Sequence, residues 1–161
     1  MEELKEKNTK SRGGDDMGID WQEDLATGIE SIDNQHREIF ARFALFSDAC
    51  SYGRGGDELL SLLNFLAEYT VVHFRDEEQA MAGADYPLAD AQEQAAAHAE
   101  FLDDFGRFRE LVEKNGPSLE TMLNQKRAMI RWLINHISHL DRSFADFLSA
   151  ARRSPPVSPP A

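Results

Sequence analysis

The sequence predicts an all-α protein, an antiparallel up-down-up-down four-helix bundle with disordered N- and C-terminal tails. Three observations support this fold class. Four long segments repeat apolar residues every three or four positions, which is the period of one helix face. Short breaks rich in glycine and proline separate these segments, and short connections between long helices favour antiparallel neighbours. No segment alternates apolar and polar residues as a half-buried strand does.

The first two expected helices are joined by the glycine-rich stretch SYGRGG at 51–56. The first covers about 31–49, and Asp33 is its expected N-cap. Its inward face comprises Ile32, His36, Ile39, Phe40, Phe43 and Phe46. The second covers about 57–81, and its inward face comprises Leu59, Leu62, Leu63, Leu66, Tyr69, Thr70, His73, Glu77 and Met81.

The last two expected helices follow the break GADYP at 83–87. The third covers about 88–114, with Ala91, Ala95, His98, Phe101, Leu102, Phe105, Phe108 and Val112 inward. Gly116 then suits a C′ position and Ser118 an N-cap, because NGPS at 115–118 stops one helix and starts the next. The fourth covers about 119–150, with Met122, Met129, Leu133, His136, Leu140 and Phe144 inward.

Composition narrows the function classes. The formal net charge of −12 argues against nucleic acid or an anionic membrane as partner, since both attract Lys and Arg. The lone Cys50 forms no internal disulfide and fits a reducing compartment. The chain lacks an 18-residue apolar run and an N-terminal apolar h-region, so we expect no membrane insertion, no secretory signal and a cytoplasmic location.

The chain divides into one domain and two tails. Residues 1–18 are polar and of mixed charge, so we expect a flexible tail. Residues 19–151 form the expected bundle. Residues 152–161 contain four of the chain's six prolines and are expected to form an extended Pro-rich tail.

Four of the five histidines fall on the inward faces of the four expected helices: His36, His73, His98 and His136. Imidazoles and carboxylates that converge from four helices are how a bundle builds a di-iron site in its core. Lone core histidines are more often structural than metal ligands. However, buried carboxylates without a counter-charge would cost several kcal/mol, and a metal removes that cost.

The spacing of the carboxylates adds to this argument. Glu77 follows His73 by four residues, so both project from one helix face about one turn apart. Asp141 follows His136 by five residues, which a straight α-helix spreads by about 140°. Both can then reach inward only if the metals lie between their two directions. Imidazole with carboxylate suits iron, manganese or zinc.

Three motifs in residues 21–147 make the sequence similar to the bacterial hemerythrin-like domains. The first is W-x6-G-x3-I-D-x-Q-H, here Trp21, Gly28, Ile32, Asp33, Gln35 and His36. The second is H-F-x2-E-E-x2-M, here His73, Phe74, Glu77, Glu78 and Met81, followed by Tyr86 and Pro87. The third is W-L-x2-H-I-x3-D, here Trp132, Leu133, His136, Ile137 and Asp141.

The resemblance implies two iron ions (Fe2+/Fe3+) with an oxo or hydroxo bridge, and reversible binding of O2. It implies that one iron takes His36 and His73 and keeps an open position for O2. The other iron would take His98 and His136, while Glu77 and Asp141 would bridge the pair. Six apolar residues would line and dry the O2 pocket, although any bundle core needs such residues: Phe40, Phe74, Phe101, Trp132, Leu133 and Ile137.

The third helix departs from the family pattern H-x3-H-x2-F. His98 and Phe101 match, but Gln94 stands where the first histidine belongs. Three interpretations stay open: the Gln94 amide is a weak ligand or holds a water, His139 or Glu93 substitutes for the histidine, or the second iron site is degraded. The flanking acids are interpreted most simply as a solvated face: Asp76, Glu78, Asp103 and Asp104.

The leading functional prediction is a protein for O2 carriage, storage or sensing rather than an enzyme. The first alternative is a di-iron peroxidase or oxidase acting on peroxide, O2 or NO, because Gln94 could leave an exchangeable position on the second iron. Even the leading prediction allows a peroxidase-like side activity. The second alternative is a metal-poor interaction domain that retains only the bundle.

Overall fold

The computed structural model describes residues 20–54, 56–116 and 118–153. The described chain contains one short 3-10 helix, η1 (Glu23–Leu25), and then a series of long helices. These are α1 (Glu30–Ser51), α2 (Gly56–Gly83), α3 (Leu88–Asn115) and α4 (Leu119–His136), followed by η2 (Ile137–Asp141) and α5 (Arg142–Arg153). None of the described residues forms a strand, so the all-α prediction is confirmed.

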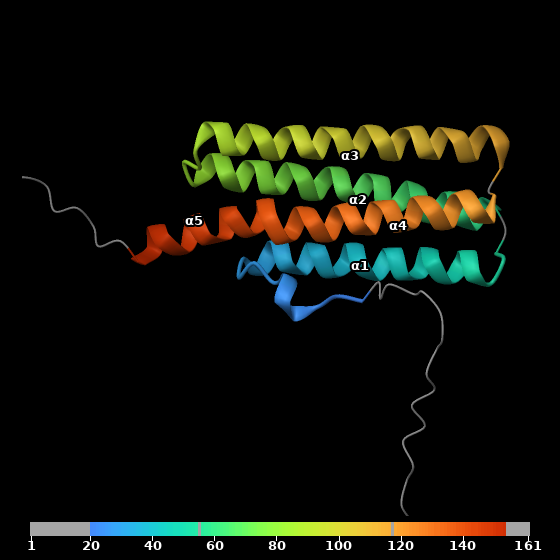
Figure 1. Ribbon diagram of the computed structural model, residues 1–161, viewed down its shortest axis with the longest axis horizontal. Helices are drawn as coiled ribbons and strands as arrows, with labels where there is room; N and C mark the ends of the chain where they lie inside the picture. Colours follow the sequence, from blue (N-terminus) through green and yellow to red (C-terminus); the bar gives the residue numbers. More distant parts are fainter. Residues whose placement is uncertain (1–19, 55, 117, 154–161) are drawn as a thin grey trace, which may run out of the picture.

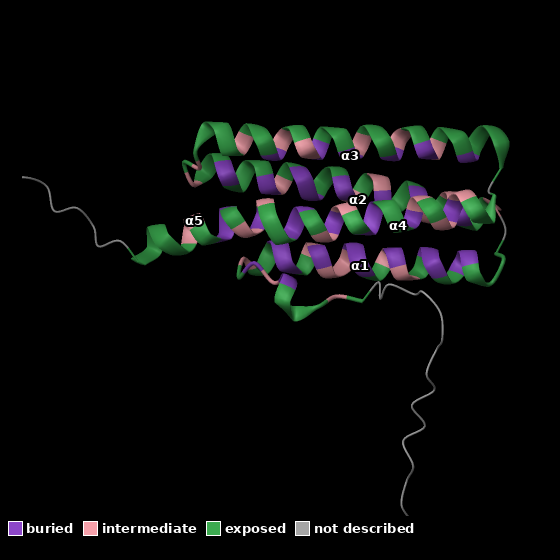
Figure 2. Cartoon of the chain, in the orientation of Figure 1, coloured by how far each residue is buried: buried purple, intermediate pink, exposed green. Residues whose placement is uncertain are grey.

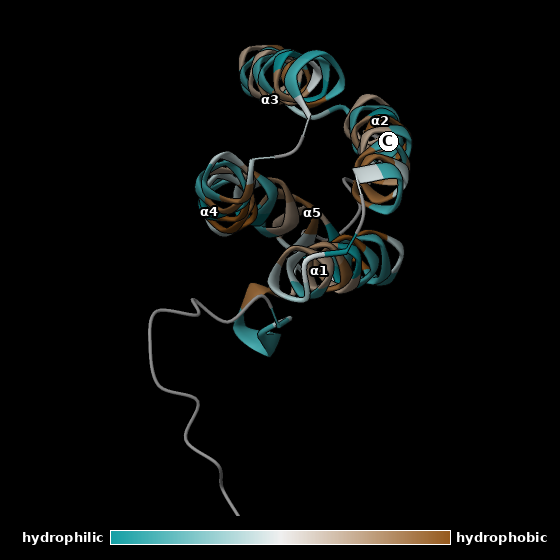
Figure 3. Cartoon of the chain, turned by 90° about the vertical axis from the view of Figure 1, so that its right-hand side faces the viewer, coloured by the Kyte–Doolittle hydropathy of each residue, from teal (hydrophilic) through white to brown (hydrophobic). Residues whose placement is uncertain are grey.

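The long helices form the predicted four-helix bundle. Figure 1 shows α1, α2, α3 and α4 side by side along their length, with α5 continuing the line of α4. Seen along the bundle in Figure 3, the helices form a ring, in which α2 contacts both α1 and α3, and α1 contacts α4. Each of the four expected helices therefore has its counterpart, with α4, η2 and α5 together forming the fourth.

Two apolar clusters of unequal size fill the bundle, and buried residues line the inward faces of its helices in Figure 2. The larger cluster includes Phe40, Phe74 and Phe101, and the smaller one is built on Ile32, Met81 and Phe144. On α1 and α2, His36 and Glu77 lie in sequence between residues of the two clusters. A layer of buried polar residues therefore separates the two clusters.

Helix boundaries follow the expected glycine signals. Gly53 ends α1 with φ of 61°, and Gly116 ends α3 with φ of 73°, which are backbone conformations that glycine adopts without steric cost. Ser118 occupies the N-cap position of α4, as predicted, although its side chain makes no capping hydrogen bond.

The expected N-cap role of Asp33 is wrong. Helix α1 begins at Glu30, so Asp33 lies inside its first turn. The Asp33 carboxylate accepts hydrogen bonds from the Thr27 backbone N–H and hydroxyl, both at 2.8 Å, and from the Gly28 N–H at 3.0 Å. Gly28 has φ of 83°, which turns the chain back toward this carboxylate. Asp33 therefore anchors the incoming segment rather than capping the helix at its own position.

The fourth expected helix is not straight, because a π-helical turn, η2, interrupts it between α4 and α5. A π-helix bonds residue i to residue i+5, so residues five apart come close to the same face. His136 and Asp141 are five apart: His136 immediately precedes this turn and Asp141 is its last residue. The turn removes the wide angular spread that a straight helix would impose on the pair.

The ends of the chain lie largely outside the described residues. The expected tail at 1–18 is not described, and of the expected tail at 152–161 only Arg152 and Arg153 are, as the last residues of α5. In the part of the chain that is described, no helix combines the length and the apolar character needed to cross a membrane.

Candidate metal centre

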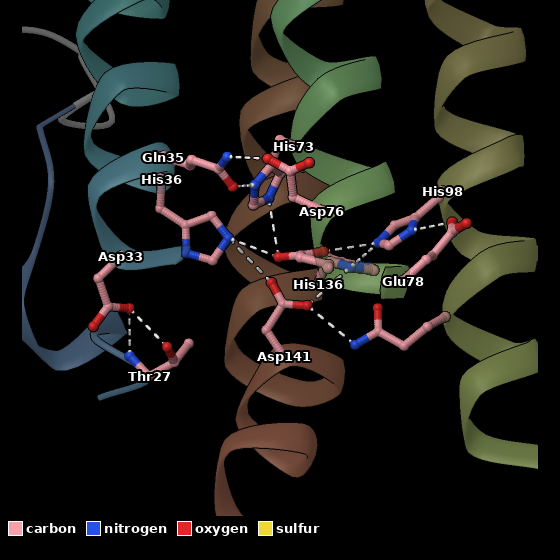
Figure 4. A network of polar contacts seen from close by, with 12 residues as sticks. Thr27, Asp33, Gln35, His36, His73, Asp76, Glu78, His98, His136 and Asp141 are labelled. Atoms are coloured by element: carbon pink, nitrogen blue, oxygen red, sulfur yellow. Dashed lines mark hydrogen bonds and ion pairs between the residues drawn. The ribbon is translucent and has the colours of Figure 1, made fainter. Parts of the chain in front are cut away.

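Four imidazoles and two carboxylates converge inside the bundle. His36 comes from α1, His73 and Glu77 from α2, and His98 from α3, while His136 ends α4 and Asp141 ends the π-helical turn η2. Each of the six residues is at most 4% exposed. Figure 4 shows the four imidazole rings turned toward one centre. The structure thus brings together all six residues predicted as ligands.

The first half of the centre is formed by His36 and His73. The Nε2 atom of His73 lies 3.0 Å from Glu77 Oε1. The Nε2 atom of His36 lies 3.3 Å from the same oxygen and 3.3 Å from Asp141 Oδ2. One oxygen of each carboxylate therefore faces this pair of imidazoles.

The second half is formed by His98 and His136, whose Nε2 atoms lie 3.1 Å apart. His98 Nε2 is 3.1 Å from Glu77 Oε2, and His136 Nε2 is 3.2 Å from Asp141 Oδ1. The other oxygen of each carboxylate therefore faces this half. Glu77 and Asp141 both span the two halves, which is the arrangement of carboxylates that bridge two metals.

The donor atoms fit a pair of metal ions. Two ligands bound at right angles, each about 2.1 Å from a metal, are about 3.0 Å apart. The separations of the donor atoms, 3.0 to 3.3 Å, are close to this value. Several donors are also buried without a hydrogen-bond partner, including both oxygens of Glu77, Nε2 of His36 and of His73, and Oδ2 of Asp141. Such unpaired atoms are costly unless a cation binds them.

The pKa values of the buried groups also indicate a site for a cation. Burial lowers the pKa of His36, but contacts with Asp141 and Glu77 outweigh it and raise the pKa to about 9. Burial opposes ionisation of Glu77, yet the neighbouring histidines, His73 first, hold its pKa well below the usual value. Burial and Glu77 likewise oppose ionisation of Asp141, but His136 and His36 lower its pKa overall. Both buried carboxyl groups therefore favour the ionised form, and a bound cation would compensate that charge.

Two of the converging histidines are held from behind by polar side chains to which the sequence analysis gave no such role. His73 Nδ1 lies 2.8 Å from Gln35 Oε1, and Gln35 Nε2 donates to Asp76 at 2.8 Å. His98 Nδ1 lies 2.9 Å from Glu78 Oε1. Asp76 and Glu78 are therefore not only part of a solvated face. Such contacts fix the ring and direct its Nε2 atom inward. The sequence signal for these contacts was the presence of Gln35 and Glu78 in the motifs that contain the histidines.

Aromatic rings cover the centre. Phe74 stacks on His98 with ring centroids 3.9 Å apart, and Trp132 stacks on His136 at 4.5 Å. Trp21, which precedes α1, stacks on His36 at 6.2 Å. Of the six residues expected to line an O2 pocket, five are buried and Trp132 is partly buried. Phe74 and Trp132 lie on the His98–His136 half.

Gln94 is buried beside this second half. Its Nε2 donates a hydrogen bond to Asp141 Oδ1 at 3.1 Å, and its Oε1 has no hydrogen-bond partner. His139 is exposed and its ring contacts the Asn135 carbonyl, while Glu93 is also exposed. The alternative in which His139 or Glu93 replaces the family histidine is therefore wrong.

Comparison with known proteins matches residues 27–148 to the family model described as the hemerythrin HHE cation binding domain. This match spans most of the described bundle. The chain belongs to the hemerythrin family. All six converging residues lie within the matched range, so the buried donors occupy the part of the chain that defines a cation-binding family.

Individual relatives agree with this membership. A bacteriohemerythrin of Pseudomonas paraeruginosa (strain DSM 24068 / PA7) is 33% identical over 129 residues, which cover 78% of each chain. A bacteriohemerythrin of Stenotrophomonas maltophilia (strain R551-3) is 33% identical over 134 residues, or 81% of each chain. The hemerythrin subunit alpha of Lingula reevii is 33% identical over 117 residues, covering 73% of this chain and 84% of that one.

Proposed function

We propose that this hemerythrin-family chain binds O2 reversibly at a pair of iron ions in the bundle core. The observation that carries the proposal is the buried set of four imidazole Nε2 atoms around two carboxylates that each face both halves. The same set fits iron by ligand type, because imidazole with carboxylate is a donor combination that iron favours. Membership of a cation-binding family and the bacteriohemerythrin relatives support the same function.

In the proposed site, His36 and His73 hold one iron and His98 and His136 hold the other, with Glu77 and Asp141 between them. Bound iron supplies the electrons that reversible O2 binding requires. The chain orients the imidazoles through Gln35 and Glu78 and surrounds them with apolar groups. A dry, apolar surrounding slows loss of iron to water and limits side reactions of bound O2.

The proposal is tested by an optical spectrum. Protein loaded with ferrous iron without O2 should develop visible absorption when O2 is admitted and lose it when O2 is removed. The variant His73→Leu should lack this response, because it loses a buried imidazole of the first half. His139→Leu, which removes an exposed histidine, is the matched control and should behave like the unaltered chain. An iron-loaded protein with no O2-dependent absorption would contradict the proposal.

One observation favours a second candidate function, a di-iron peroxidase or oxidase acting on peroxide, O2 or NO. Gln94 stands at the position of a family histidine, and an amide binds iron less strongly than an imidazole does. A second iron with fewer protein ligands favours reaction over reversible binding. The discriminating measurement is turnover: steady consumption of peroxide, O2 or NO by the iron-loaded protein, suppressed in Gln94→His, would support this candidate.

A further inference from the structure

The two halves of the centre offer the same protein donors. Each half has two imidazole Nε2 atoms, one oxygen directed from Glu77 and one from Asp141. Among the described residues, the groups of side chains that could hold a metal are His36–His73–Glu77 on one half and Glu77–His98–His136–Asp141 on the other, and neither contains a third histidine. Asp141 reaches the first half only through Oδ2, which lies 3.3 Å from His36 Nε2. The protein therefore gives neither metal a third imidazole, and the two halves become nearly equivalent.

Position 94 is where the two halves could have differed, because a histidine there would have given the second half a third imidazole. The chain has Gln94 instead. It lies one helical turn before His98 on α3, and it is only 1% exposed. Its amide N–H is directed at Asp141 Oδ1, the carboxylate oxygen that also faces His136. The opposite orientation of the amide would set two acceptor oxygens against each other without a proton between them, so the carboxylate selects the N–H.

This orientation leaves the amide oxygen without a donor. Gln94 Oε1 is fully buried and has no hydrogen-bond partner in the described chain. An unsatisfied buried acceptor costs about 1–3 kcal/mol, and a water held beside it would remove that cost. The side chain therefore both fixes the carboxylate and offers an acceptor to a small hydrogen-bond donor at the second half.

We propose that Gln94 is a positioning residue for Asp141 that leaves an exchangeable position at the His98–His136 metal. Water in this position could donate to the free amide oxygen, and a small anion could displace that water from the metal. This inference rests on the proposed iron pair. Both metals then have a position for an external ligand, one on each half. Phe74 and Trp132 stack on His98 and His136 and bound this half with apolar rings, which restricts the position to small ligands.

The test counts external ligands with sodium azide. Protein loaded with two irons and oxidised to the ferric form is titrated calorimetrically, after an iron assay. We expect two azide ions per chain. Gln94→His restores an imidazole at the open position and should bind only one. Gln92→His places a histidine on the exposed face of the same helix and should still bind two, which makes it the matched control.

A third variant separates a positioning amide from a ligating one. Gln94→Leu has no amide, so it should still bind two azide ions, and far-UV circular dichroism should show the same helix content. If Gln94 were a ligand, the unaltered chain would bind one azide and Gln94→Leu would bind two, which would overturn the inference.

The remaining outcomes separate this inference from the proposed function. If the unaltered chain holds two irons but binds only one azide, this inference is overturned and the proposed function stands. The same holds if Gln94→His binds two azide ions. A chain that binds no iron would overturn both.

Discussion

His36 shows at the scale of one residue how protons and metal compete for the centre. Its raised pKa of about 9 means that the metal-free chain holds a proton on this imidazole at neutral pH. Because a metal binds only the neutral ring, metal binding must displace that proton. The proton also stabilises the metal-free fold, fully below pH 6.5 and progressively less as the pH rises through about 9.

We therefore expect ferrous iron to release protons when it binds the metal-free chain at pH 7.5. His36 alone should contribute roughly one proton per chain. The release is measured with an indicator dye in weak buffer under an inert atmosphere, and excess chelator should reverse it. The apparent affinity for iron should rise with pH until about pH 9 and then level off. A release that does not depend on pH between 7 and 10 would contradict this assignment.

Glu78 supports His98 from outside the centre. Its carboxylate contacts His98 Nδ1 at 2.9 Å and orients that ring. Loss of such a contact typically lowers metal affinity by about 10–100-fold. Glu78→Leu should therefore release one iron per chain more readily to a chelator, with the other iron unaffected. Glu100→Leu makes the same chemical change at an exposed site of α3 and should release both irons at the unaltered rate.

Among the helical elements, the π-helical turn η2 decides which residue faces the buried centre. In a straight α-helix, position 140 would share the face of His136, because residues four apart lie nearly above one another. With the turn in place, Asp141 is buried and contacts His136 while Leu140 is only partly buried. Exchanging the two side chains therefore distinguishes a π-turn from a straight helix.

The double variant Leu140→Asp and Asp141→Leu should lose at least one iron per chain, because the carboxylate leaves the centre. Iron per chain is measured after loading and gel filtration, and circular dichroism should show unchanged helix content. Retention of two irons by the exchanged variant would mean that the straight-helix arrangement is correct.

The same element shows what the sequence could predict. Apolar periodicity located all four long helices, and the motifs located all six converging residues, because both depend on local patterns. The π-turn was missed because the fourth segment was assigned one continuous α-helical period, although the five-residue spacing of His136 and Asp141 was a signal of it. The contacts of Gln35 and Glu78, and the hydrogen bond from Gln94 to Asp141, were missed because they depend on which helices become neighbours.

At the scale of the whole molecule, the centre ties four helices together. The six converging residues come from α1, α2, α3, α4 and the π-helical turn η2, so a metal pair bound to them would cross-link the bundle at one level. Without metal, the two buried carboxylates depend on protonated imidazoles for compensation. Stability should therefore depend on metal, because a ligand that binds only the folded state stabilises it.

Metal loading should raise the melting temperature by about 5–10 °C, since a ligand present at 100 times its Kd contributes about 2.7 kcal/mol. The measurement is thermal unfolding followed by circular dichroism at pH 7.5, with and without chelator. Glu77→Gln removes a charge that both halves share, so its melting temperature should respond less to the metal. Equal melting temperatures for the loaded and metal-free chain would contradict the cross-link.

The central claim is that this bundle binds O2 reversibly at an iron pair. Its most direct test is the stoichiometry of gas uptake, measured with an oxygen electrode on protein of assayed iron content. Reversible binding should give two irons per chain and one O2 taken up per iron pair, released again when the O2 pressure falls. No uptake by the iron-loaded chain, or continuous consumption of O2 without release, would contradict it.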